Sequence, residues 1–161
     1  ELGGSVIAEL LGIATTTLPS VDYGAFSAWC DVVRDAYAQN IVLAARDISD
    51  GGVLTAVAEM AIASEGVGVT LREDPVHLRH EALWFAESPG FVLQVSDADA
   101  LFAVCARHDT WALEIGTTSD DGRLVYRHND AEGRAVNDEI AVAALREAWE
   151  APLRDFYGSV A

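Results

Sequence analysis

The sequence predicts an α+β fold, a mixed β-sheet with helices packed on it, in a single domain that covers residues 1–161. Segments with helical periodicity alternate with apolar runs of strand length, which is the pattern of helices packed on a sheet. Two strand-like segments also flank an Asp-Asp-Gly turn at 120–122, which indicates a hairpin. With 51% hydrophobic residues, a chain of 161 residues can bury a core without disulfides or a metal.

Helices are predicted where apolar residues recur at helical spacing behind a residue suited to capping. Asp22 and Asp97 stand directly before two such segments and are expected to cap them. The predicted helices cover residues 5–12, 22–40, 53–63, 79–86, 97–108 and 136–149. In the second of them, the residues expected on the buried face are Phe26, Trp29, Val33 and Tyr37.

Strands are predicted from short apolar runs and from alternation of apolar and polar residues. Residues 41–46 (IVLAAR) form a continuous apolar run, which is typical of a buried central strand. Residues 111–115 alternate as a half-buried strand does, and we expect them to pair with 124–126 across the turn. Further strands are expected at 68–71 and 91–95.

The composition argues against two functional classes. The chain has 26 acidic and 10 basic residues, all of the latter Arg, and a net charge of −16. This field repels phosphate backbones, so no nucleic-acid partner is expected, and any bound nucleotide needs metal ions to screen its charge. No apolar run approaches the roughly 18–20 residues that span a bilayer, so we predict a cytoplasmic protein without a membrane partner.

The cysteines and one pair of histidines are weak candidates for chemistry. Cys30 and Cys105 each lie in an apolar helical pattern, which favours buried free thiols over a disulfide and gives neither a catalytic role. His77 and His80, beside Glu81, have the spacing of metal ligands. No further ligand accompanies them, so a solvated loop is the better interpretation.

The segment ARDISDGGV at 45–53 places a polar turn between a strand and a helix. Asp47, at the carboxyl end of the strand, could hold Mg²⁺, which prefers one or two carboxylates together with phosphate oxygens. The first turn of a helix presents free N–H groups, and Gly51 and Gly52 let a ligand approach them without meeting a Cβ. Ser49 could cap the helix or donate to a phosphate. A plain capping turn uses the same residue types, so both interpretations stay open at this point.

Several motifs occur together along the chain: ELGGS at 1–5, ARDISDGGV at 45–53 followed by AEM at 58–60, and FAESPG at 85–90. In this order and spacing the sequence resembles the second C-terminal-type domain of phosphoribosylformylglycinamidine (FGAM) synthase, of the aminoimidazole ribonucleotide (AIR) synthetase superfamily. The resemblance extends over nearly the whole chain. It implies an AIR synthase-related C-terminal domain that was cut from a larger multidomain enzyme.

The resemblance also implies a function. The enzyme is an ATP-dependent ligase of purine biosynthesis: an amide oxygen of formylglycinamide ribonucleotide (FGAR) is phosphorylated, and glutamine-derived ammonia then displaces it. The implied cofactors are ATP and Mg²⁺, and no catalytic residue is assigned. The implied site residues are Asp47 for the metal, Ser49, Gly51 and Gly52 for the nucleotide, and Glu87 and Ser88 for the substrate.

The implied partners are upstream synthetase domains, a glutaminase domain or subunit, and the ribonucleotide. A homodimer of the fragment is also expected, because the apolar residues exceed what one core of this size can hide; they include Trp29, Trp84, Trp111 and Trp149. The loop before the first helix, with Ser5 as its cap, is either a phosphate-binding loop or a hinge. Arg46 stands where the family usually has His. Two alternatives remain: a structural half-domain with a degenerate nucleotide site, and a stand-alone small-molecule binding module.

Overall fold

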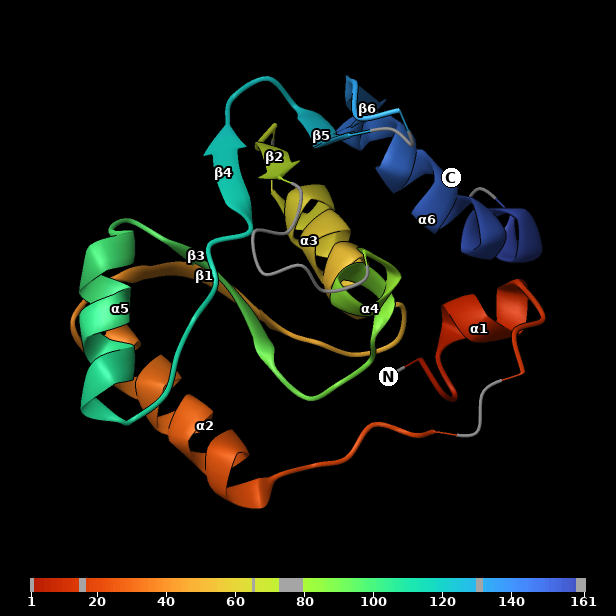
Figure 1. Cartoon of the computed structure of the whole chain (residues 1–161). Coiled ribbons are helices and arrows are strands. Elements are labelled where there is room, and N and C mark those ends of the chain that lie inside the picture. Colours follow the sequence, from red (N-terminus) through yellow and green to blue (C-terminus); the bar gives the residue numbers. More distant parts are fainter. Residues whose placement is uncertain (1, 15–16, 65, 73–79, 130–131, 159–161) are drawn as a thin grey trace. The chain divides into compact units, whose positions relative to one another are not determined.

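The computed structural model describes residues 2–14, 17–64, 66–72, 80–129 and 132–158, which form two compact units (Figure 1). Unit 1 comprises Glu1–Val57 and Asp74–Glu114, and unit 2 comprises Ala58–Glu73 and Ile115–Ala161. Helices alternate with strands, and one of the sheets is mixed, so the predicted α+β class is confirmed. The single domain over the whole chain stays a prediction.

Unit 1 contains a two-stranded antiparallel sheet and several helices, two of which pack on the sheet (Figure 1). Its strands are β1 (Val42–Asp47) and β3 (Phe91–Val95). Its helices are α1 (Val6–Leu10), α2 (Tyr23–Ala38), α4 (His80–Phe85), α5 (Ala98–Arg107) and the start of α3 (Gly52–Ala63). The core of the unit lies where α2 and α5 meet the sheet, and consists of Val32, Ala36, Ile41, Val42, Leu101, Val104 and Cys105.

The two predicted caps of unit 1 are confirmed. The Asp22 side chain accepts from the N–H groups of Gly24 and Ala25, and the Asp97 side chain accepts from that of Ala100. Each carboxylate therefore binds donors that the first turn of a helix leaves without an intrahelical partner.

The predicted buried face of α2 is only partly right. Phe26 stacks on Phe91 at 5.8 Å, and the Trp29 indole N–H donates to Thr110 Oγ1 at 2.8 Å. The most deeply buried positions are, however, Val32 and Ala36, and Tyr37 is exposed. Val32 and Ala36 are four residues apart and share the face of α2 that packs into the core, whereas Tyr37, the next residue, points away from that face.

The strand predicted at 41–46 exists, but its expected place as a buried central strand is wrong. Within the described residues β1 pairs only with β3, and Leu43 is 61% exposed. Ile41 and Val42 are buried against α2 and α5, whereas the strand beyond them is largely open. An apolar run does not reveal how many neighbours a strand has, because that depends on distant segments.

Unit 2 contains a four-stranded sheet in the order β4-β2-β5-β6. The strands are β2 (Gly68–Arg72), β4 (Gly116–Ser119), β5 (Arg123–Asn129) and β6 (Ala135–Ala141). β2 runs parallel to β5 and antiparallel to β4, while β6 is antiparallel to β5.

The hairpin predicted across the Asp-Asp-Gly turn is therefore wrong. β2 lies between β4 and β5, so the strands that flank the turn are not neighbours. Residues 111–115 form no strand, and β4 begins only at Gly116. The turn is nevertheless ordered by Asp121, whose Oδ1 accepts from Ser119 Oγ and from the Arg123 N–H. These donors hold the pKa of Asp121 below its usual value.

The last predicted helix was placed too early. The segment from Ala135 to Ala141 is β6, which covers the edge of β5, and α6 (Val142–Tyr157) follows it. The backbone N–H and C=O groups of β5 need partners along that edge, and β6 supplies them. The spacing of apolar residues in this segment fits a helix, and it contains no information about the hydrogen-bond partners that β5 needs.

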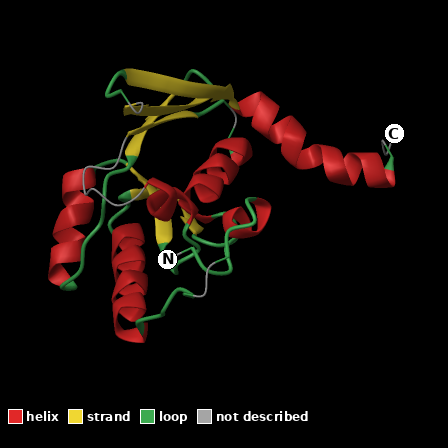
Figure 2. Cartoon of the chain, turned by 45° about the vertical axis from the view of Figure 1, so that its right-hand side comes forward, coloured by secondary structure: helices red, strands yellow, loops and turns green. Residues whose placement is uncertain are grey.

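The C-terminal half of α6 carries exposed apolar side chains at helical spacing. Figure 2 shows α6 leaving the sheet of unit 2 and running outward toward the C-terminus. We call Trp149, Leu153, Phe156 and Tyr157 the α6 stripe, with exposed fractions from 61% (Trp149) to 80% (Phe156). Trp111 is also exposed, whereas Trp84 is buried and Trp29 is half-buried.

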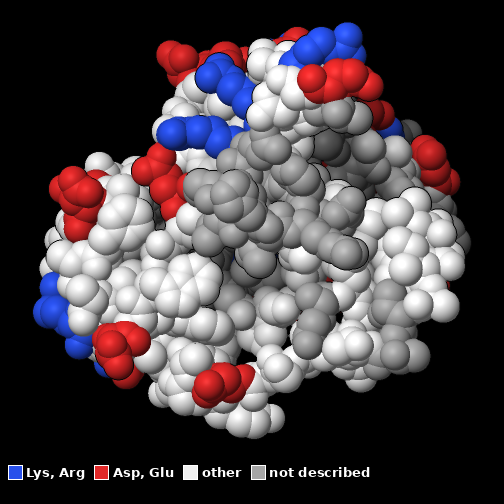
Figure 3. Space-filling view, in the orientation of Figure 1, with Lys and Arg blue, Asp and Glu red and all other residues white. Residues whose placement is uncertain are grey.

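The surface of the chain carries charges of both signs. On the face drawn in Figure 3, acidic side chains are spread among uncharged ones, and Arg side chains lie beside acidic groups. Among the described helices, none is long and apolar enough to cross a bilayer.

Both cysteines are free, but only Cys105 is buried, so the predicted burial of Cys30 is wrong. Burial raises the pKa of the Cys105 thiol.

Candidate functional site

The antiparallel pairing of β1 with β3 brings two of the sequence motifs together. Asp47, the last residue of β1, lies opposite Phe91, the first residue of β3. The turn after β1 and the loop before β3 therefore share one end of the sheet, where the Ile48 N–H donates to Gly90 O at 2.9 Å. Motifs that are far apart in the sequence are thus side by side in unit 1.

The carboxylate of Glu87 connects both segments to the third motif. Its Oε1 accepts from the Gly51 N–H at 2.8 Å and from the Val6 N–H at 2.8 Å. Val6 is the first residue of α1, and Gly51 directly precedes α3. We call the segments 2–6, 47–52 and 84–90, which meet at this oxygen, the motif junction.

The N-terminal segment of the junction is fixed by Ser5, which is only 3% exposed. Its hydroxyl donates to Leu2 O at 2.7 Å and accepts from the Ala8 N–H, so the predicted cap of the first helix is confirmed. Gly4 has a φ of +77°, a conformation that favours glycine. This segment is therefore part of a packed corner of unit 1.

The two glycines of the turn are required by packing within the chain. Gly52 has a φ of +73°, and a Cβ there would lie 2.7 Å from Trp84 O and 2.8 Å from the carbonyl carbon of Phe85. Gly51 has a φ of +82°, and its Cβ would meet the side chain of Thr55. Their N–H groups are also engaged, Gly51 with Glu87 and Gly52 with the Ser49 carbonyl at 3.0 Å. The nucleotide contacts predicted for these glycines stay a prediction, since the fold alone accounts for them.

The side chains that the turn offers to a ligand are those of Asp47, Ser49 and Asp50, all exposed. None of the three makes a side-chain hydrogen bond or ion pair with the part of the chain that the structure describes. Ser49 therefore does not cap α3 through its hydroxyl, and that alternative for its role is wrong. The carboxylate that binds the N–H group before α3 is that of Glu87, and no pattern in the sequence predicts this contact.

The donor set at the turn fits a magnesium ion only in company with phosphate. Among the described residues, no group of three or more His, Cys, Asp or Glu side chains is arranged to hold a metal. Mg²⁺ needs one or two carboxylates when phosphate oxygens and water complete its octahedron, and Asp47 meets that requirement. The pair of His77 and His80 lies outside the residues whose side chains the structure describes.

The predicted substrate residues Glu87 and Ser88 are both half-buried at the junction. One oxygen of Glu87 is occupied by two backbone donors, which leaves its second oxygen and the Ser88 hydroxyl for a ligand. Substrate contact by this pair stays a prediction.

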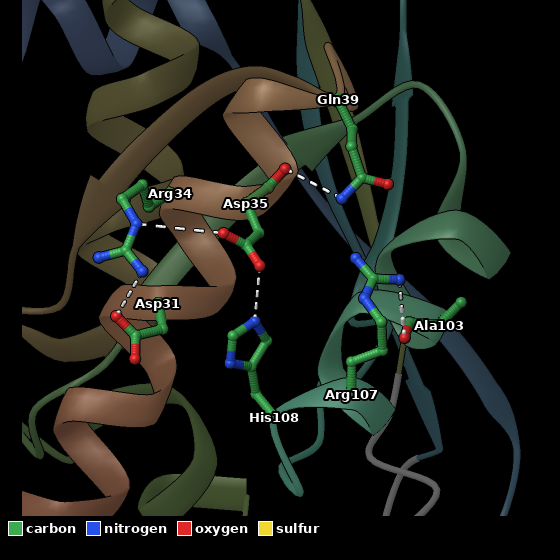
Figure 4. Close-up of polar contacts among 7 residues, drawn as sticks. All are labelled: Asp31, Arg34, Asp35, Gln39, Ala103, Arg107 and His108. Atoms are coloured by element: carbon green, nitrogen blue, oxygen red, sulfur yellow. Dashed lines mark hydrogen bonds and ion pairs between the residues drawn. The ribbon is translucent and has the colours of Figure 1, made fainter.

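A second polar cluster in unit 1 joins α2 to the end of α5 (Figure 4). His108 Nε2 lies 2.8 Å from Asp35 Oδ2, and Arg34 approaches the other oxygen of Asp35 at 4.0 Å. The contact with His108 lowers the pKa of Asp35, and the charges of His108, Arg34 and Arg107 act in the same direction. Because its groups pair with one another, this cluster holds the helices together and is a poor candidate for a ligand site.

The sequence of the chain is similar to proteins named phosphoribosylformylglycinamidine synthase subunit PurL. The relative from Gluconobacter oxydans is 37% identical over 72% of this chain, which is 16% of that protein. The relative from Halobacterium salinarum is 35% identical over 99% of this chain, which is 19% of that protein. The chain therefore spans about a fifth of the length of the curated relatives it matches.

The fold is shared with solved structures from Thermotoga maritima. The structure of PurLQS superposes with a TM-score of 0.65 at 16% identity, over 81% of this chain and 23% of that one. PurL complexed with FGAR gives a TM-score of 0.64 at 17% identity, over 84% of this chain and 23% of that one. These likenesses concern the fold alone.

The family described as AIR synthase related protein, C-terminal domain, matches residues 2–129, which include all of the motif junction. Similar sequences over nearly the whole chain and a shared fold agree with that match. The chain belongs to the family of AIR synthase related proteins and represents its C-terminal domain.

Proposed function

We propose that this chain is part of a phosphoribosylformylglycinamidine synthase, which uses ATP and glutamine-derived ammonia to convert FGAR to the amidine in purine biosynthesis. The observation that carries the proposal is the motif junction, where the segments of the resemblance meet at one carboxylate and leave Asp47 and Ser49 exposed. The names of the relatives support it.

In this proposal the turn after β1 contacts a nucleotide. Asp47 holds a magnesium ion, Ser49 donates to a phosphate, and Gly51 and Gly52 lie against the nucleotide. The ion supplies positive charge that screens the phosphates from a chain of net charge −16. Solved neighbours of the same fold include PurL complexed with ATP, ADP and AMPPCP, which supports a nucleotide as the ligand. Glu87 and Ser88 are proposed to lie near the ribonucleotide.

The remaining parts of the proposal concern the setting. Upstream synthetase domains and a glutaminase are the proposed partners, and the neighbour named PurLQS supports a multi-component assembly. The protein is proposed to act in the cytoplasm. The 161-residue chain alone is proposed to be inactive in amidation, because it contains no Lys to serve the phosphates of ATP. Product formed by the purified chain above a blank without enzyme would refute this point.

A second candidate is a structural half-domain with a degenerate site. It is favoured by the N–H groups of Gly51 and Gly52, which Glu87 and Ser49 already occupy. In that case the junction serves packing, and the chain contacts other domains without binding a nucleotide.

The experiment that separates the two candidates is Asp47→Asn in the intact protein that carries this sequence. Removal of the carboxylate is expected to release bound nucleotide during purification in Mg²⁺. Asp50→Asn is the matched control, because it removes the same charge from the same exposed turn. If nucleotide is present in the unmodified protein and stays stoichiometric in the Asp47 variant, the metal role is refuted. If neither the unmodified protein nor any variant carries or binds nucleotide, the half-domain with a degenerate site is supported.

A further inference from the structure

We infer that Glu87 is the positioning residue of the motif junction: its Oε1 fixes the turn of Asp47 and Ser49 by holding the N–H groups of Gly51 and Val6. The inference rests on the proposed function for its link to nucleotide binding. The clamp itself follows from the contacts of the chain alone. It differs from a ligand role, because the oxygen acts on the backbone of its own chain.

The geometry favours a clamp over a chance contact. Both donors lie 2.8 Å from the same oxygen, although one is 36 and the other 81 residues away in sequence. Each belongs to the start of a helix, α3 or α1, where an N–H group has no intrahelical acceptor. One carboxylate thus binds the first N–H groups of two helices that are far apart in the sequence.

The electrostatics explain why an acid stands here in so acidic a chain. Asp47 and Asp50 flank the same turn, and a third carboxylate nearby is disfavoured by repulsion. The positive ends of peptide dipoles at helix starts offset that repulsion, and hydrogen bonds to an ionised acceptor are stronger than neutral ones. The carboxylate is therefore compensated by the two donors that it holds.

The clamp matters for the turn because Gly52 is fixed by its packing on α4, whereas few hydrogen bonds hold the residues before it. Ile48 donates to Gly90 and Gly52 donates to Ser49, and both are backbone contacts. The exposed side chains of Asp47 and Ser49 add no hydrogen bond within the described residues. Loss of the Glu87 contact leaves Gly51, with its φ of +82°, held by its chain neighbours and by the hydrogen bond that Thr55 Oγ1 donates to its carbonyl at 3.0 Å. The position of Asp47 and Ser49 should then vary, and a ligand that needs both should bind less tightly.

The test compares Glu87→Ala, Glu87→Gln and the control Glu9→Ala in the intact protein. Glutamine keeps an oxygen acceptor at the same place without the charge, and Glu9 is an exposed glutamate of α1 outside the junction. Two quantities are measured: hydrogen–deuterium exchange of the amides of Val6 and Gly51, and binding of the ATP analogue AMPPCP with Mg²⁺.

In Glu87→Ala, exchange is expected to rise about ten-fold or more at both amides, since each loses a hydrogen bond to a charged group. Binding of the analogue should weaken in parallel. Glu87→Gln should restore most of both quantities, and Glu9→Ala should change neither. Rescue by glutamine distinguishes positioning from a role of the charge itself.

Two results would overturn the inference. Exchange that stays unchanged at Val6 or at Gly51 in Glu87→Ala would show that no clamp joins them. Native exchange in Glu87→Gln together with lost analogue binding would show that the carboxylate touches the ligand directly. If Glu87→Ala does not fold, the glutamine variant decides alone: native exchange with retained binding supports the clamp. If the unmodified protein binds no analogue, the proposed function fails, while the exchange data still decide the clamp.

Discussion

Replacement of Gly52 by alanine should destabilise the chain more than the same change at another glycine with positive φ. Gly52 has a φ of +73°, in the left-handed region. Placing a residue with a Cβ in that region lowers the stability of the fold by roughly 1–2 kcal/mol. The added Cβ would also lie 2.7 Å from Trp84 O and 2.8 Å from two backbone atoms of Phe85. These are backbone atoms of the α4 end and cannot rotate away. Overpacking of this kind costs about 1–3 kcal/mol more, so the total is roughly 2–5 kcal/mol.

Gly12→Ala is the matched control. Gly12 has a φ of +63° in the same unit, but a Cβ there meets nothing within 4 Å. It should lose only the conformational part, roughly 1–2 kcal/mol. Urea unfolding of the chain, followed by tryptophan fluorescence, measures both variants, and a common slope against urea validates the comparison. Equal losses of stability in the two variants would refute the close packing of Gly52 on α4 as its reason.

Three further predictions concern other parts of the molecule. Because His108 lowers the pKa of Asp35, this contact stabilises the fold above the ordinary aspartate pKa of about 4, and the contribution is lost as pH falls through the lowered value. Asp35→Asn should therefore be less stable near neutral pH but converge with the parent in acid, and unfolding midpoints that differ equally at all pH values would contradict this. A thiol reagent should label Cys30 in the native chain and Cys105 only after unfolding, as mass spectrometry of timed samples can show. The exposed α6 stripe should cause the chain to self-associate, and salt should strengthen this association. Leu153→Ser should weaken the free energy of association by up to about 1.5–3 kcal/mol for each leucine that the contact buries. Sedimentation at several salt concentrations tests both expectations.

Local signals in the sequence predicted the local parts of the fold. The caps Asp22 and Asp97 were identified because an N-cap side chain binds N–H groups two or three residues ahead of it. Ser5 was identified in the same way. Each depends only on neighbours in the chain, which a pattern of residues contains.

Errors arose wherever a distant segment decides the structure. The predicted hairpin is wrong because β2 lies between β4 and β5. The helix predicted over residues 136–141 is wrong because the open edge of β5, which these residues cover, is not visible in the sequence. In the candidate site, the turn and its exposed Asp47 and Ser49 were predicted, whereas the part of Glu87 in joining three segments was not. No spacing rule predicts a hydrogen bond across 81 residues.

The place of β2 in its sheet has a consequence for synthesis. Val69 pairs with Thr118 on one side and with Leu124 on the other, so both neighbours of β2 are translated long after it. During translation, β2 therefore has two unpaired edges until β4 and β5 have left the ribosome. Pairing between segments that are distant in the sequence is also slow. During that interval its free backbone groups can pair with strands of other nascent chains. Chaperone demand should accordingly be greatest between completion of β2 and release of β5, and a truncation that ends before β5 should aggregate.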